Sequence, residues 1–141
     1  MKLQIKKVDV WKAEIADRPG GLAGKLAALA AAKASLEFVL ARRAPETPGR
    51  AVAFVWPVKG AKQAQAAAAA GFAKTTDLFA VRVEGGDKPG LGAKMAQALA
   101  AGGINLRGLS AAVIGRRFVA YIAADTDLDA SRVVAVLKKL A

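Results

Sequence analysis

Short runs of β-prone residues alternate with alanine-rich stretches along the whole chain. Runs rich in Val, Ile, Phe and Trp are typical of strands, and Ala is the best helix former. In the first half this pattern predicts the order β-α-β-β-α-β. The expected elements are strand 8–16, helix 22–34, strands 36–40 and 51–56, helix 59–70 and strand 72–77.

The pattern then repeats. The segment 17–20, Asp-Arg-Pro-Gly, recurs 70 residues later as Asp-Lys-Pro-Gly at 87–90. Pro is tolerated in the first turn of a helix, and an Asp just upstream can accept from free helical N–H groups, so both motifs predict helix starts. The expected elements of the second half are strand 78–84, helix 91–102, strands 104–109 and 118–123, and helix 127–140.

The repeat predicts two units, residues 7–77 and 78–141. The second unit ends directly after its last helix and lacks a sixth strand of its own. The 70-residue offset places residues 1–6 at that position, and Leu3 and Ile5 alternate there with polar residues. We therefore expect residues 1–6 to complete the second sheet, with a frayed terminus as the alternative.

The βαββαβ order predicts an α+β fold: two ferredoxin-like units, each an antiparallel sheet with its helices on one face. A unit of about 70 residues is marginal alone. We therefore expect the two units to pack on each other and the chain to form a homodimer.

Composition narrows the chemistry. The 141 residues include no His and no Cys, which excludes disulfides, Cys/His metal sites and His catalysis. We expect no catalytic residues, no metal, no cofactor and no enzymatic activity. No run is long enough to span a membrane, and the first residues lack the apolar core of a signal peptide, so we expect a cytoplasmic protein. The net charge of +11 favours anionic partners of any kind.

Both motifs, with the segments Leu-Glu-Phe-Val (36–39) and Gly-Gly-Ile-Asn-Leu (102–106), resemble the ACT domain, and the resemblance covers nearly the whole chain as two copies. It implies a regulatory module that binds small molecules, most often amino acids, at interfaces between ACT units. There the loop after the first strand meets the start of the second strand. The implied ligand-binding residues are Asp17, Arg18, Pro19, Gly20, Gly21, Leu22, Ser35, Leu36, Asp87, Lys88, Pro89, Gly90, Leu91, Gly92, Ile104, Asn105 and Leu106.

The physics of such a site is independent of the family. A helix N-terminus presents free N–H groups that suit a carboxylate, glycines admit close approach to the backbone, and an Asp in the loop can accept from an ammonium. Ser35 stands where the family has Asn, so the second unit is the stronger candidate. We expect a small or branched aliphatic amino acid as the ligand and a separate partner protein as the regulated target.

Two other functions stay open. RNA-recognition motifs share the βαββαβ order, and the segment 115–121, Gly-Arg-Arg-Phe-Val-Ala-Tyr, partly matches their third-strand signature. Phe118 and Tyr121 point to opposite faces of a regular strand, however, so Phe118 is predicted to be a core residue. The other alternative is a dimerisation scaffold without a ligand.

Overall fold

The computed structural model describes residues 2–140, which form two compact units. One comprises residues 9–75. The other combines the chain before Asp9 with the chain from Thr76 onward. The elements are β1 (Leu3–Val8), β2 (Trp11–Ala16), α1 (Gly21–Ala31), β3 (Phe38–Arg43), β4 (Arg50–Trp56), α2 (Gly60–Ala69), β5 (Ala73–Lys74), β6 (Phe79–Gly86), α3 (Leu91–Ala101), β7 (Gly108–Ile114), β8 (Arg117–Ala124) and α4 (Asp127–Lys138). None of the described helices is long and apolar enough to cross a membrane.

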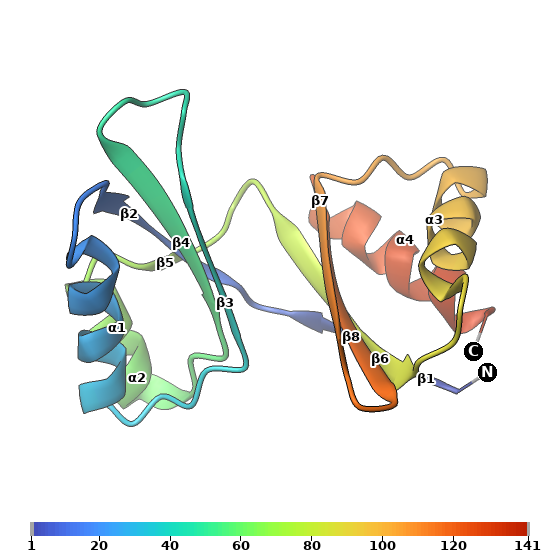
Figure 1. The fold of residues 1–141 in the computed structure, drawn as a ribbon, viewed down its shortest axis with the longest axis horizontal. Coiled ribbons are helices and arrows are strands. Elements are labelled where there is room, and N and C mark those ends of the chain that lie inside the picture. The colour runs from blue at the N-terminus through green and yellow to red at the C-terminus, as the bar shows by residue number, and fades with distance from the viewer. Residues whose placement is uncertain (1, 141) are drawn as a thin grey trace. The chain divides into compact units, whose positions relative to one another are not determined.

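The C-terminal unit is a sheet in the order β1-β6-β8-β7, antiparallel throughout, with α3 and α4 on one face (Figure 1). Its first edge strand comes from the beginning of the chain. β1 pairs with β6 over six residues, from Leu3 opposite Gly85 to Val8 opposite Ala80. A segment that precedes the N-terminal unit in sequence thus belongs to the sheet of the other unit.

The N-terminal unit repeats the arrangement in the order β3-β4-β2-β5, with α1 and α2 on one face (Figure 1). The expected α+β fold of two ferredoxin-like units is confirmed. The strand expected over 72–77 is only two residues long, and it pairs with the start of β2.

Each unit has its own hydrophobic core between sheet and helices. Along β8 the alternate residues Phe118, Ala120, Ile122 and Ala124 enter the core, as the two-residue period of a strand requires. The expectation that Phe118 is a core residue is therefore confirmed. Because it packs toward the helices, its ring is not free to stack on a nucleic acid base at the other face of the sheet.

The second strands of both units begin later than expected. The strands predicted at 36–40 and 104–109 are observed at Phe38–Arg43 and Gly108–Ile114. The residues directly after each helix bring the chain back to the sheet, and Ile104 and Leu36 pack against the cores as they do so. The apolar residues just before β3 and β7 led to the prediction of a strand that begins earlier. A connecting segment that packs against the core has the same apolar composition as a strand.

The last helix begins with a side-chain cap. Thr126 Oγ1 accepts a hydrogen bond from the backbone N–H of Asp129 at 3.0 Å. Thr126→Ala is expected to lower the free energy of unfolding by about 1 kcal/mol, since the N–H then loses its acceptor. Urea denaturation measures the change. Thr126→Ser keeps the hydroxyl and should stay close to the parent, and equal losses in both variants would contradict the capping role.

Candidate functional site

The loop between β6 and α3 has a fixed shape. The Asp87 N–H donates to the Arg116 carbonyl at 2.8 Å, which ties the loop to the turn between β7 and β8. The Leu91 N–H donates to the Lys88 carbonyl at 3.2 Å. Gly90 caps α3 with φ 82°, a left-handed conformation that strains any residue with a side chain. The motif thus holds the start of α3 beside the end of β7.

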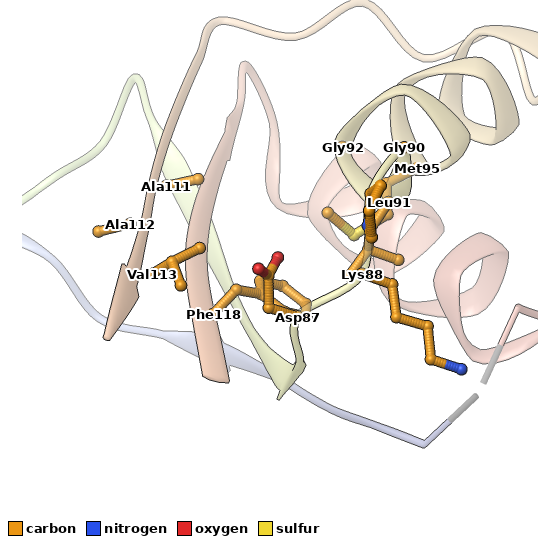
Figure 2. A pocket seen from close by; sticks show the side chains of 11 residues that line it. Asp87, Lys88, Gly90, Leu91, Gly92, Met95, Ala111, Ala112, Val113 and Phe118 are labelled. Carbon is orange, nitrogen blue, oxygen red and sulfur yellow. The ribbon is translucent and has the colours of Figure 1, made fainter. Parts of the chain in front are cut away.

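An open cavity of about 430 Å³ lies between this loop and β7 (Figure 2). Its floor is apolar, because Leu91, Met95 and Phe118 are buried core residues that reach its wall. β7 is the edge strand, and Val113 on it is 53% exposed. The lining residues are Asp87, Lys88, Pro89, Gly90, Leu91, Gly92, Met95, Ala111, Ala112, Val113 and Phe118.

Polar groups converge at one end of the cavity. Asp87 and Phe118 both line this end, and in Figure 2 the Asp87 carboxylate overlaps the Phe118 ring on the side of α3 that faces β7. Within residues 2–140 this carboxylate takes part in no ion pair and no side-chain hydrogen bond. The first turn of α3 has no side-chain cap, so its N–H groups after that of Leu91, which donates to Lys88, are free and carry the partial positive charge of the helix terminus. Lys88 extends its ammonium away from β7 (Figure 2). A carboxylate and backbone donors therefore adjoin an apolar floor.

The N-terminal unit repeats the loop. Asp17 N–H donates to the Gly49 carbonyl at 3.1 Å, Gly21 N–H to the Arg18 carbonyl at 3.1 Å, and Gly20 has φ 85°. One contact differs: Arg43 on β3 donates from Nε to the Asp17 carboxylate at 2.6 Å. The residue 70 positions after Arg43 is Val113. The two loops therefore share their backbone hydrogen bonds and glycine conformation. They differ in that the Asp17 side chain has Arg43 as a partner, whereas Val113 stands at the corresponding position near Asp87.

Eleven of the seventeen predicted site residues do not line this cavity. Six of the eleven, residues 17–22, form the corresponding loop of the N-terminal unit. Ser35 and Leu36 follow the C-terminal end of α1, and residues 104–106 follow that of α3, whereas the motif loops stand at the helix N-termini. Ile104 is buried in the core, and Asn105 is exposed. Within one chain, the structure brings residues 87–92 to the cavity and leaves residues 104–106 at the other end of α3.

Sequence reasoning missed the opposite wall. Met95, Ala111, Ala112 and Val113 line the cavity, and Phe118 was identified only as a core residue. A signal for part of this wall existed. The 70-residue offset aligns Val113 with Arg43 and Met95 with Lys25, so these two positions of the cavity wall are apolar where the first unit has cations.

A second polar cluster lies away from the cavity. Arg82 donates to Glu84 at 3.0 Å and to the Tyr121 hydroxyl at 3.3 Å, and Arg117 lies 3.5 Å from the other Glu84 oxygen. The hydrogen bond from Arg82 lowers the pKa of Glu84 from its usual value. Because its charges pair with one another, this cluster is a structural contact across β6 and β8. No group of three or more acidic, His or Cys side chains suited to a metal occurs among the described residues.

The fold is similar to several solved structures. Protein BT0572 from Bacteroides thetaiotaomicron matches with a TM-score of 0.77 and 17% identity, over 96% of this chain and 89% of that one. The ligand-free regulatory subunit of aspartate kinase from Thermus thermophilus gives 0.65 and 20%, over 99% and 96%. The E. coli aspartokinase III in complex with aspartate and ADP gives 0.61 and 17%, over 97% and 32%.

The chain thus has the fold that the resemblance to the ACT domain implies, two ferredoxin-like units in tandem. Its architecture is that of the regulatory subunits of aspartate kinase, which it matches over nearly their full length. No protein-family profile and no curated protein matches the sequence.

Proposed function

We propose that the chain is a non-enzymatic regulatory module that binds an amino acid in the cavity between residues 87–92 and β7. The observation that carries the proposal is the convergence there of a carboxylate, free helix N–H groups and an apolar floor. The tandem fold shared with aspartate kinase regulatory subunits supports a regulatory role. The target would be a separate protein in the cytoplasm.

The cavity matches the three parts of an amino acid. The Asp87 carboxylate accepts hydrogen bonds from the ligand's ammonium, and the first-turn N–H groups of α3 bind its carboxylate. Met95, Val113 and Phe118 contact the side chain. Because these contacts are apolar, they favour a small or branched aliphatic side chain over a charged one.

A second copy of the chain would complete the site. β7 has an unpaired edge that carries no charge or proline, and exposes Leu109, Val113 and Ile114. Edges of this kind pair readily with another chain. Antiparallel pairing of two β7 strands places the start of one beside the end of the other. Residues 104–106, which precede β7, would then approach the cavity of the other copy, where Asn105 can donate and accept hydrogen bonds.

Thermal unfolding in the presence of each standard amino acid, at about 10 mM, tests the proposal. A ligand at ~100 times its Kd stabilises the folded state by roughly 2.7 kcal/mol, which raises the Tm by about 2–4 °C per kcal/mol. We expect a shift with one or a few aliphatic amino acids. Asp87→Asn should weaken binding by about ten- to a hundred-fold, the loss of a charged hydrogen bond, whereas the matched variant Asp17→Asn should not.

Polyuridine RNA serves as the contrasting sample. Salt-sensitive RNA binding without a shift for any amino acid would contradict the proposal and favour a nucleic-acid-binding protein. No shift with either would favour a dimerisation scaffold. An amino acid that stabilises the Asp87→Asn variant as well as the parent would bind at another place.

A further inference from the structure

The two motif loops have nearly the same backbone and different surroundings. The residues that surround the Asp87 cavity correspond, at the 70-residue offset, to residues around Asp17. Val113 corresponds to Arg43 and Met95 to Lys25. From the strand pairing, Phe118 opposite Val113 corresponds to Ala51 opposite Arg43. At these three positions the apolar wall of one unit is replaced by two cations and a small residue in the other.

Both cations have partners within the N-terminal unit. Arg43 Nε lies 2.6 Å from the Asp17 carboxylate, whose side chain is only 29% exposed. Lys25 donates its ammonium to the Ala70 carbonyl at the end of α2. Asp17 therefore already has a cation beside it, supplied by the neighbouring strand of the same sheet.

Residues 17–22 with β3, and residues 87–92 with β7, are here called the N-terminal and C-terminal half-sites. We propose that the Arg43 side chain occupies the N-terminal half-site in place of a ligand. Its guanidinium takes the position beside Asp17 that a ligand's cationic nitrogen takes beside Asp87, so each chain binds one ligand, at its C-terminal unit. This inference rests on the proposed function for the existence of the ligand. It adds that the C-terminal half-site selects ligands in which a cationic nitrogen lies next to an apolar group.

An exposed ion pair is weak in itself. Arg43, however, is fixed on β3 next to Asp17, and a tethered group competes at an effective concentration of millimolar order or above. A free ligand at the N-terminal unit would have to displace it, and would then meet Lys25 and Ala51 in place of Met95 and Phe118. Electrostatics and shape both favour the C-terminal half-site.

Exchange of the two corresponding residues tests the inference. The probes are L-leucine and n-butylammonium, the second carrying only a cation and an apolar tail, each at about 10 mM. Backbone amide NMR reports the response of residues 17–22 and 87–92 separately. In the parent chain we expect shifts confined to 87–92. Val113→Arg should place a guanidinium beside Asp87 and weaken that response at least ten-fold, and Arg43→Val should add a response at 17–22.

The outcomes separate the inference from the proposed function. Equal responses of both loops in the parent chain, or an unchanged response in Val113→Arg, would overturn the inference and leave amino acid binding intact. A response to n-butylammonium alone, confined to 87–92, would support the inference and contradict amino acid sensing. Silence of both loops toward both probes would overturn the inference. If Arg43→Val does not fold, Arg43→Gln also removes the charge, and its Asp17 loop should gain the response.

Discussion

A chain that lacks residues 1–8 is expected to lose the fold of its C-terminal unit while residues 9–75 stay folded. β1 pairs with β6 over its full length, and Leu3 and Ile5 pack against the core. Burial of each such side chain stabilises the fold by up to about 1.5–3 kcal/mol. Small domains are stable by roughly 5–15 kcal/mol in total, so a large share is lost. Amide NMR should show collapsed signals only for residues 76–140.

Point variants test whether the C-terminal unit depends on the side-chain packing of β1 as well as on the presence of the strand. Ile5→Asp places a carboxylate against the core and should destabilise the C-terminal unit strongly, whereas Gln4→Asp changes an exposed neighbour on the other face of the same strand. A synthetic peptide of residues 2–9 added to the truncated chain should restore the missing signals. If the C-terminal unit stays folded without β1 and ignores the peptide, the proposed division of the chain is wrong.

Leu109→Glu is expected to convert a homodimer into a monomer. Leu109 is 49% exposed on β7, the free edge that we propose pairs with a second copy. In a twofold interface each substitution occurs twice, so two carboxylates are introduced into an apolar contact, where burial of a charge is costly. Light scattering on a sizing column should give the 14.4 kDa monomer for the variant and twice that mass for the parent chain.

The repeat supplies a matched control for this variant. Val39 stands 70 positions before Leu109, on the edge strand β3, and is 44% exposed. β3 carries Arg42 and Arg43, which oppose edge-to-edge pairing. Val39→Glu should therefore keep the parent mass. A parent chain that is monomeric at all concentrations, or dissociation by Val39→Glu alone, would place the interface elsewhere or remove it.

The sequence was sufficient for the order of the elements, because strand composition, alanine-rich helices and a proline-glycine motif at each helix start are local signals. The 70-residue offset also placed residues 1–6 in the second sheet, and in the structure Leu3–Val8 pairs with β6. Strand starts were less predictable. Ile104 is apolar because it packs under α3, and a segment that crosses a core resembles a strand in composition.

About half of the candidate site could be predicted from the sequence in the same way. Residues 87–92 form one wall and are contiguous, so a motif reveals them. The other wall comes from Val113 and its neighbours on β7, about twenty residues further on, and only the sheet order brings it there. Asn105 shows the limit of assigning binding residues from a family's motif. Its place in the repeat was correct, yet within one chain it lies at the far end of α3 from the cavity.

The origin of β1 also sets the order in which the protein can fold during its synthesis. β1 is made before the N-terminal unit, but its partner β6 (Phe79–Gly86) emerges only after the whole of that unit. At roughly 5–20 residues per second, β1 waits about 4–15 s as an unpaired strand. Residues 9–75, which lie between β1 and β6 in the sequence, can meanwhile fold as the N-terminal unit while β1 still lacks its partner. The C-terminal unit can therefore close only after the N-terminal unit has been made, and its closure joins two segments that are synthesised before and after that unit.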